Sequence, residues 1–310
     1  MQQQSIGILG TGAIGSYYGV RLAKAGYQVS FLARSEYQHI SQHGLRIDSA
    51  VHGVLELPQA DVYQDAGQMP QVDWLLVATK TTSNGQLAPL INQMLKPGGK
   101  LVLLQNGFAV EDKLRPKLRD DIHLLGGLCF ICVHRAAAGV VVHQAYGGIN
   151  LGYHSGPRDG QDGQKIAAQG AQMFARSGEE SQAIELLRAR WQKLVWNIPY
   201  NGLSVMLDTT TGAMMQHTSA RALIESLMEE VAKAARVCGH QLSENVVAAM
   251  LKNTDRMPDY HPSMYHDYVQ GRELELEAIY RAPLAAARAV GYEMPRVQML
   301  LQALEFKTGS

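Results

Sequence analysis

A glycine-rich turn near the start of the chain constrains the fold more than any other sequence feature. The motif Gly10-x-Gly12-x-x-Gly15 directly follows a short apolar run. A helix-like segment over 16–25 and a second apolar run over 29–33 come next. Strand, glycine turn, helix and strand in this order are typical of the βαβ unit that binds dinucleotides, so we predict such a site here.

Each glycine of this turn has its own expected role. Gly10 permits the tight turn, Gly12 lets the backbone approach a pyrophosphate, and Gly15 lets the helix pack closely on the strand. The N-terminus of the helix offers N–H groups to the phosphates. An ordinary glycine turn is the alternative interpretation. The cofactor-binding residues predicted from the turn are Gly10, Thr11, Gly12, Ala13, Ile14 and Gly15.

Arg34, at the end of the second apolar run, indicates which dinucleotide is bound. Sites that prefer NAD usually carry Asp or Glu at this place, where the acid holds the ribose hydroxyls. A guanidinium instead suits a 2′-phosphate, so we predict NADPH/NADP+ as the cofactor. The alternative is that Arg34 is a surface arginine and that the nearest acid, Glu36, binds the ribose.

Composition excludes several functional classes. The 310 residues are enough for two domains. Lys plus Arg and Asp plus Glu both number 28, so charge favours neither a nucleic-acid partner nor an acidic membrane. We find no run long enough to span a bilayer and no signal peptide before the first expected strand, so a cytoplasmic protein is expected. The oligomeric state is left open, with a homodimer among the alternatives.

Three cysteines fit a reducing compartment. Cys129 and Cys132 form a CxxC inside an apolar run typical of a buried strand, on which the two thiols point to opposite faces. No second pair completes a zinc site, and the histidines lack metal-binding spacing. We therefore expect no metal site and interpret both cysteines as core residues.

The predicted fold class is α/β, with an N-terminal Rossmann-type doubly wound sheet followed by an all-helical C-terminal domain. Residues 1–180 form the expected NADP-binding domain and 181–310 the expected substrate and catalytic domain. Residues 155–164 are expected to form a solvated loop. Further strands are expected at 72–78, 100–104 and 122–128, with an antiparallel edge at 140–145 and 148–151. Long helices are expected at about 182–206, 218–238 and 264–290.

Two polar residues of the first domain follow strand ends. Lys80 comes after the strand that ends at residue 78, and Asn106 comes after the strand that ends at residue 104. The carboxyl ends of parallel strands are where α/β proteins bind ligands, so both are candidate site residues. The alternatives are a solvated loop lysine and an ordinary Asn-Gly turn.

Lys193, Asn197 and Asn201 are spaced i, i+4 and i+8, which places them in one line along a helix. Their neighbours are apolar nearly all round, so the helix should be buried. A buried lysine is unfavourable unless it has a partner or a function, and burial lowers its pKa, so Lys193 could deliver a proton near neutral pH. The alternative is a surface lysine beside two packing amides. Pro199 keeps that alternative open, because a proline can bend the helix.

A third polar group lies near the C-terminus. Ser263 is expected to be the N-cap of a helix. Glu273, Glu275 and Glu277 are spaced i, i+2 and i+4, so they cannot all share one helix face. At least one is therefore expected to point inward, and the pattern leaves open which one.

With these motifs in place, the chain resembles the ketopantoate reductases (2-dehydropantoate 2-reductases) from about Ser5 to about Leu304. The glycine turn and Arg34 match the cofactor side of that family. The other matching motifs are Val77-Ala78-Thr79-Lys80, Gln105-Asn106-Gly107, Trp191-x-Lys193-Leu194-x-x-Asn197-x-x-x-Asn201, Pro262-Ser263-Met264-x-x-Asp267 and Gly271-Arg272-x-x-Glu275.

The resemblance implies that NADPH reduces the ketone of a 2-oxo acid, with ketopantoate as the substrate, in the synthesis of pantothenate and coenzyme A. It implies that Lys193 is the catalytic proton donor and that Glu275 acts near the cofactor and the lysine. Lys80 would lie near the nicotinamide end of the cofactor, and Asn106 by both cofactor and substrate. The substrate-binding residues implied are Asn106, Asn197, Asn201 and Ser263.

The chain departs from the family pattern at three places. Tyr280-Arg281 replaces Asn-Gly, Thr211 replaces an asparagine that contacts substrate in some members, and Gly202 replaces a frequent proline after Asn201. All three are expected on the substrate side. The alternative functions are reduction of another small 2-oxo acid, a 3-hydroxyacid-type dehydrogenase, and a non-catalytic NADP-sensing module.

Overall fold

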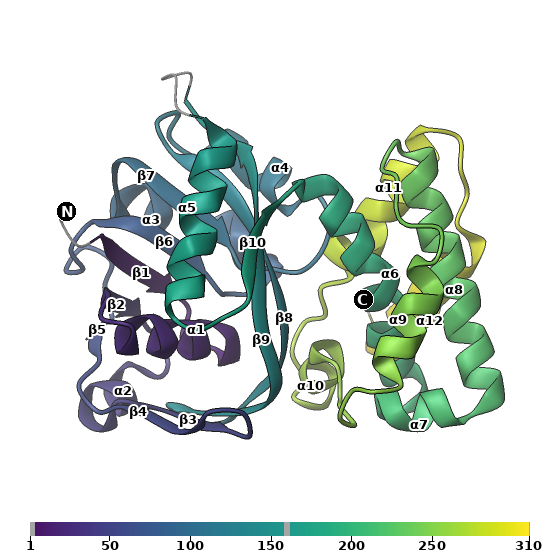
Figure 1. Cartoon of the computed structure of the whole chain (residues 1–310), viewed down its shortest axis with the longest axis horizontal. Coiled ribbons are helices and arrows are strands. Elements are labelled where there is room, and N and C mark those ends of the chain that lie inside the picture. The colour runs from purple at the N-terminus through teal and green to yellow at the C-terminus, as the bar shows by residue number, and fades with distance from the viewer. Residues whose placement is uncertain (1–3, 158–161, 310) are drawn as a thin grey trace. The chain divides into compact units, whose positions relative to one another are not determined.

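The computed structural model describes residues 4–157 and 162–309. The chain divides into two compact units, each of which can be followed in Figure 1. The first unit runs to Gln105 and resumes from Val110 to Leu186, and the second comprises Asn106–Ala109 and the chain from Leu187 onward. Of the loop predicted at 155–164, residues 158–161 lie outside the described residues.

The first unit is a ten-stranded sheet, as far as the structure describes it, with helices on both faces. The strands are β1 (Ser5–Leu9), β2 (Gln28–Leu32), β3 (Leu45–Ser49), β4 (Gly53–Leu57), β5 (Asp61–Tyr63), β6 (Val72–Val77), β7 (Leu95–Leu103), β8 (His123–Ala137), β9 (Val140–Ser155) and β10 (Ser181–Ile184). The helical segments are α1 (Ala13–Lys24), α2 (Tyr37–His43), η1 (Thr81–Ser83), α3 (Asn84–Met94), α4 (Val110–Leu114), η2 (Arg115–Lys117) and α5 (Gly163–Arg176).

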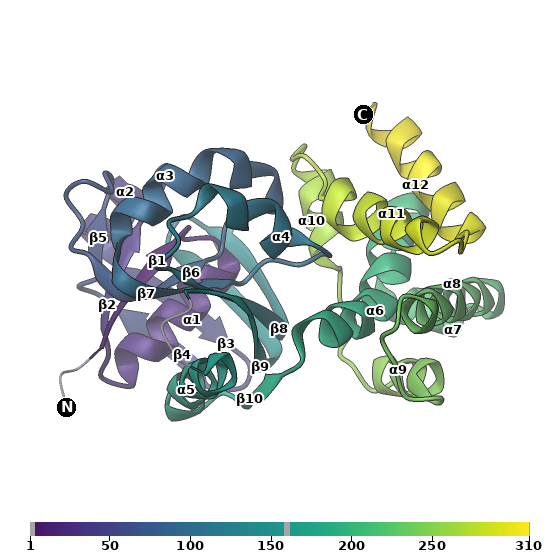
Figure 2. The same ribbon diagram turned by 90° about the horizontal axis from the view of Figure 1, so that it is seen from above.

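The strand order is β4-β3-β9-β8-β7-β6-β1-β2-β5, with β10 added beside β9. The central strands β8, β7, β6, β1 and β2 are parallel to one another. Successive residues of a strand point to opposite faces, and each face has its own apolar core. Ile6 and Ile8 pack with α1 and α5, whereas Leu75 and Val77 pack with α3 on the other face. Figure 2 shows α3 on one side of the sheet and α1 and α5 on the other. The predicted doubly wound fold is confirmed.

The antiparallel edge predicted at 140–145 and 148–151 is wrong in two respects. Both segments belong to one strand, β9, which is antiparallel to β8. Its other side pairs with β3 near Val141 and with β10 near Leu151, so it is not an edge strand. Tyr146 and Gly147 have positive φ (66° and 141°), which interrupts the alternating pattern in mid-strand and hides its continuity. Strand β10 lies beyond residue 180, where only helices were predicted.

The second unit consists of helices and loops in its described residues. The helices are α6 (Leu186–Leu207), α7 (Thr211–Gln216), α8 (Thr218–Val237), α9 (Val246–Thr254), α10 (Ser263–Val269), the π-helical η3 (Glu277–Arg281), α11 (Ala282–Ala289) and α12 (Pro295–Thr308). They enclose one apolar core to which α6 and α8 contribute prominently. The predicted all-helical C-terminal domain is confirmed. Within residues 4–157 and 162–309, none of the helices is both long and apolar enough to cross a membrane.

The single helix predicted at 264–290 is wrong. Helix α10 ends at Val269, and η3 begins only at Glu277. Gly271 has φ 62° and turns the chain, and the backbone N–H of Arg272 bonds the carbonyl of Asp267 at 2.9 Å. The predicted N-cap role of Ser263 is also wrong, because Ser263 is the first helical residue and Pro262 occupies the N-cap position.

Candidate active site

The glycine turn between β1 and α1 has the geometry that its sequence predicts. Gly10 has φ 102°, and a Cβ added there would lie 2.7 Å from Cγ2 of Thr79. Gly15 packs so closely that its Cβ would contact the carbonyl oxygen of Gly10. At Gly12, by contrast, no described heavy atom lies within 4 Å of the added Cβ. The turn is therefore tight at its first and third glycines and open at the second.

The N-terminus of α1 carries no side-chain cap among the described residues. Gly12 occupies the N-cap position in an extended conformation (φ −68°, ψ −174°). The amide of Ser16 bonds the Gly12 carbonyl at 2.9 Å and closes the first helical turn. The first N–H groups of a helix lack intrahelical partners, and the helix dipole adds positive potential there, so this terminus suits an anion.

Gln105 connects two loops at the carboxyl ends of strands. Its Nε2 donates to the Thr79 carbonyl at 2.9 Å and to Oδ1 of Asn84 at 2.7 Å, and Nδ2 of Asn84 donates back to Oε1 of Gln105 at 2.9 Å. These bonds hold the loop that carries Lys80, which is half-buried at the N-cap of η1. The hydroxyl of Thr79 is buried without a hydrogen-bond partner in the described part of the chain, so it is available to a ligand.

Sequence reasoning missed Thr79, Asn84 and the structural role of Gln105. Gln105 and Thr79 carried a signal, since each directly precedes a candidate residue, Asn106 or Lys80, in a matched motif. Asn84 depends on which loops the sheet brings together, and this order cannot be read from the sequence.

Arg34 and Glu36 lie in opposite environments. Arg34 is exposed directly after β2, whereas Glu36 is only 6% exposed. The carboxylate of Glu36 pairs with Nη1 of Arg135, and it accepts a second bond from the backbone N–H of Gly139 at 3.3 Å. Binding of a ribose by Glu36, the alternative drawn from the sequence, would have to compete with both contacts and with the burial of the side chain.

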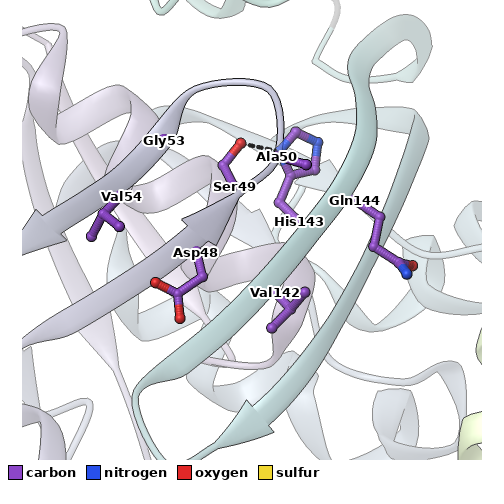
Figure 3. Close-up of a pocket in the computed structure, with 8 residues that line it drawn as sticks. All are labelled: Asp48, Ser49, Ala50, Gly53, Val54, Val142, His143 and Gln144. Atoms are coloured by element: carbon purple, nitrogen blue, oxygen red, sulfur yellow. Dashed lines mark hydrogen bonds between the residues drawn. The ribbon is translucent and has the colours of Figure 1, made fainter.

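A surface pocket lies on β3, β4 and β9, and Figure 3 shows its lining. It contains none of the site residues predicted from the sequence. Nδ1 of His143 bonds the Ser49 hydroxyl at 2.8 Å, and Nε2 donates to the carbonyl of Tyr146 at 2.9 Å. Burial lowers the pKa of His143, which fits a neutral ring bonded at both nitrogens. We therefore interpret His143 as a structural residue of the sheet.

In the second unit, α6 carries the predicted polar line. Lys193, Asn197 and Asn201 all lie on this one helix, which continues through Pro199. Asn197 is 5% exposed, Asn201 is 2% exposed and Lys193 is half-buried. The apolar neighbours of the line belong to the core of the unit. The predicted buried helix is confirmed.

The buried side-chain nitrogen of Asn197 is unsatisfied in the described part of the chain. Its Nδ2 is buried and makes no hydrogen bond to the described residues. An unsatisfied buried donor costs about 1–3 kcal/mol, so such groups usually serve a ligand or an ordered water. A carbonyl or carboxylate oxygen of a bound molecule would satisfy it.

The turn that contains Asn106 is attached to the segments carrying the other site residues. The amide of Phe108 donates to the carbonyl of Ala278 at 2.8 Å, three residues beyond Glu275. The Phe108 ring lies 4.8 Å from that of Trp191, two residues before Lys193. Gly107 has φ 108°, and a Cβ there would lie 2.8 Å from the Ala278 oxygen. The second unit thus brings the asparagine turn, the lysine helix and the glutamate segment together.

Glu275 is the inward-pointing acid, which the spacing of the three acids left open and the family resemblance named. It is 5% exposed, whereas Glu273 and Glu277 are exposed. The loop before it is closed by buried Asp267, whose Oδ1 accepts from Nε of Arg272 at 2.9 Å. The prediction that at least one of the three acids points inward is confirmed.

Comparison with known proteins now adds the family. The model described as "Ketopantoate reductase PanE/ApbA" matches residues 6–156, and its C-terminal counterpart matches residues 185–308. The chain belongs to the ketopantoate reductase family. It is therefore an oxidoreductase of the class that acts on CH–OH groups.

Similar proteins cover the whole chain. A 2-dehydropantoate 2-reductase from Nostoc sp. is 40% identical over 310 residues, which is 100% of this chain and 97% of the relative. The crystal structure of 2-dehydropantoate 2-reductase from Geobacter metallireducens has a TM-score of 0.90 at 36% identity and covers 98% of this chain and 100% of its own. That from Methylococcus capsulatus has a TM-score of 0.84 at 31% identity, covering 99% and 98%.

The departures from the ketopantoate reductase pattern have structural partners within the second unit. Thr211 donates from its hydroxyl to the carbonyl of Tyr260 at 3.1 Å. Arg281 pairs with Glu305 at 2.7 Å. Tyr280 is fully buried, and its hydroxyl donates to the carbonyl of Ile198 at 3.0 Å. These contacts join α7 to the loop before α10, and η3 to α6 and α12, while the expected position of these residues on the substrate side stays a prediction.

Gly202 and Tyr280 are a matched pair of departures. A Cβ added at Gly202 would lie 2.6 Å from the Tyr280 hydroxyl and 2.7 Å from Cδ2 of Leu300. Overpacking a closed core costs about 1–3 kcal/mol, so we expect Gly202→Ala to lower the free energy of unfolding by that amount in denaturant titrations. The added methyl has no open space to occupy.

Two further variants test this steric reading. Combining Gly202→Ala with Tyr280→Phe removes the obstructing hydroxyl and should recover part of the loss, because the Leu300 contact remains. Gly85→Ala in α3 is the control, since nothing lies within 4 Å of its added Cβ. A Gly202→Ala protein as stable as the wild type would refute the tight contact.

Proposed function

We propose that this member of the ketopantoate reductase family reduces ketopantoate (2-dehydropantoate) to pantoate with NADPH, in pantothenate and coenzyme A synthesis. The observation that carries the proposal is the line of Lys193, Asn197 and Asn201 along α6, in which the buried Asn197 amide lacks a partner among the described residues. The full-length identity with a protein named 2-dehydropantoate 2-reductase supports the choice of substrate.

The first unit supplies the proposed cofactor site. Bound NADPH would provide a hydride for the ketone carbon. The open backbone at Gly12 and the uncapped N-terminus of α1 suit the pyrophosphate. Arg34 is exposed and would pair with the 2′-phosphate, while Lys80 would lie toward the nicotinamide.

The second unit supplies the proposed proton donor. As hydride reaches C2 of the ketone, negative charge develops on the ketone oxygen, and the Nζ of Lys193 would donate a proton there to give the hydroxyl. The Asn197 amide would donate a hydrogen bond to an oxygen of the substrate. Asn106, Asn201 and Ser263 would orient the carboxylate and hydroxyl groups. Glu275 is buried, and its negative charge would stabilise the protonated form of Lys193, which is the form that donates the proton.

The departures from the family pattern at Thr211 and Tyr280-Arg281 do not weaken the choice of ketopantoate. Thr211, Tyr280 and Arg281 are each engaged with another part of the second unit. Their replacement of the usual residues therefore has an explanation in packing, and a different substrate is not needed to account for it.

Loss of nicotinamide absorbance with ketopantoate tests the proposal. We expect kcat/KM of at least about 10⁴ M⁻¹s⁻¹ with NADPH, typical of an enzyme acting on its own substrate. Pyruvate and other small 2-oxo acids are the comparison substrates. Oxidation of a 3-hydroxy acid with NADP+ tests the alternative of a 3-hydroxyacid-type dehydrogenase. Faster turnover of another 2-oxo acid would reject ketopantoate. NADPH binding with no turnover of any substrate would favour a sensing module.

A further inference from the structure

Glu36 occupies a place where an acid would oppose binding of NADPH. It lies two residues beyond Arg34 and is the N-cap residue of α2, although its side chain makes no cap bond. Acids at this point of a dinucleotide fold accept bonds from the ribose hydroxyls, and they repel a 2′-phosphate. A free carboxylate at Glu36 would therefore favour NADH and counteract Arg34.

The structure turns this carboxylate toward the β8–β9 hairpin. One oxygen of Glu36 pairs with Nη1 of Arg135 on β8, and the other accepts from the amide of Gly139 in the turn. The Glu36 side chain is 7% exposed, whereas that of Arg135 is 43% exposed. Both oxygens are thus engaged, and the pair is buried on the acid's side. Removing Arg135 would leave the Glu36 carboxylate buried without its charged partner.

The hairpin that holds Glu36 is itself fixed. The Gly139 carbonyl accepts from the amide of Arg46 at 2.9 Å. Gly139 has φ 67°, and a Cβ there would lie 2.7 Å from Cδ2 of His39 on α2 and 3.0 Å from the Gly44 oxygen. The turn therefore packs tightly against α2. This packing fixes the β8–β9 hairpin, which carries Arg135, beside Glu36.

We propose that Arg135 sets the cofactor preference by withholding Glu36 from the ribose site. Arg135 is a positioning residue: it neutralises and turns away the acid, so that Arg34 alone meets the 2′ position of the cofactor. This inference rests on the proposed use of NADPH. It adds that the preference for NADPH over NADH depends on Arg34 and also on the ion pair between Arg135 on β8 and Glu36 in the loop after β2.

The test compares dissociation constants of NADPH and NADH for the full-length protein, by fluorescence titration. Arg135→Met keeps a long apolar stem and releases the acid, so the preference for NADPH should fall about tenfold through repulsion of the phosphate. Glu36→Gln removes the charge and should keep the preference. The double variant Arg135→Met with Glu36→Gln should restore it, because no acid remains to be withheld.

The double variant separates positioning from direct contact. If Arg135 bound the phosphate itself, the double variant would stay as weak as Arg135→Met, and the inference would be overturned. An Arg135→Met protein with unchanged preference would also overturn it. If the methionine variant does not fold, Arg135→Gln replaces it in the same titrations. This variant keeps amide donors but removes the positive charge. Arg46→Met removes two exposed ion pairs, with Asp48 on β3 and Glu56 on β4, and should leave the preference unchanged.

The wild type and Arg34→Asp show whether the underlying cofactor assignment is at fault. Arg34→Asp should lose the preference for NADPH whatever Arg135 does, because it removes the phosphate's own partner. A wild-type protein without a preference would overturn both the proposed cofactor and this inference. A wild type that prefers NADPH and an Arg34→Asp that loses the preference, together with an unaffected Arg135→Met, would overturn the inference alone.

Discussion

Lys193→Ala is expected to lower kcat for ketopantoate by about 10³-fold, within the range that a positioned general acid contributes. The lysine lies on buried helix α6 between residues of the apolar core, so its replacement by a smaller residue should leave the fold in place. NADPH should bind as to the wild type, because the glycine turn and Arg34 are untouched. Single-turnover absorbance measurements, with NADPH affinity measured in parallel, separate the chemical step from binding.

Two matched variants accompany the lysine change. Gln192→Ala alters the exposed neighbour on the same helix and should keep full turnover. Lys193→Arg keeps a cation but cannot release a proton near neutral pH, so it should remain almost as slow as the alanine variant. Turnover by Lys193→Ala at the wild-type rate would remove Lys193 from the mechanism.

Gly10→Ala should weaken NADPH binding by about 100-fold or more, since it displaces the N–H groups that meet the phosphates, and each charge-assisted bond contributes about 1.5–3 kcal/mol. Gly10 has φ 102°, which a residue with a Cβ rarely adopts, and the added atom would lie 2.7 Å from Thr79. The strained backbone should also lower the free energy of unfolding by about 1–3 kcal/mol.

Gly26→Ala is the control that separates strain from binding. Gly26 also has a positive φ, 90°, but nothing lies within 4 Å of its added Cβ. This variant should lose stability through the backbone conformation and still bind NADPH like the wild type. If both variants bound NADPH equally well, the glycine turn would not be the phosphate site.

Local spacing explains why much of this protein could be predicted from its residues. The βαβ frame around Gly10, Gly12 and Gly15 follows from neighbours within about thirty residues, because turn, helix and strand preferences are local. The line of Lys193, Asn197 and Asn201 follows from the helical period alone. These features needed no knowledge of the rest of the chain.

Other features escaped the sequence because they depend on contacts between distant segments. Strand β9 pairs with both β3 and β10, and nothing in the local sequence of these strands identifies which strand each pairs with. The helix predicted at 264–290 is interrupted at four consecutive residues without an apolar side chain, 270–273, where Gly271 takes a positive φ that the prediction did not allow for. The spacing of the three acids likewise did not show that Glu275 is the buried one.

The sequence by itself determined the dinucleotide-binding class of fold, the order of sheet and helices, and the helix that carries Lys193. Only the tertiary structure decided what became of Glu36, which is held by a hairpin about one hundred residues further along the chain. It likewise decided that Tyr280 fills the space beside Gly202. A side chain's chemistry is written in the sequence, but the partner that restrains it is chosen by packing, which acts between residues far apart in the chain.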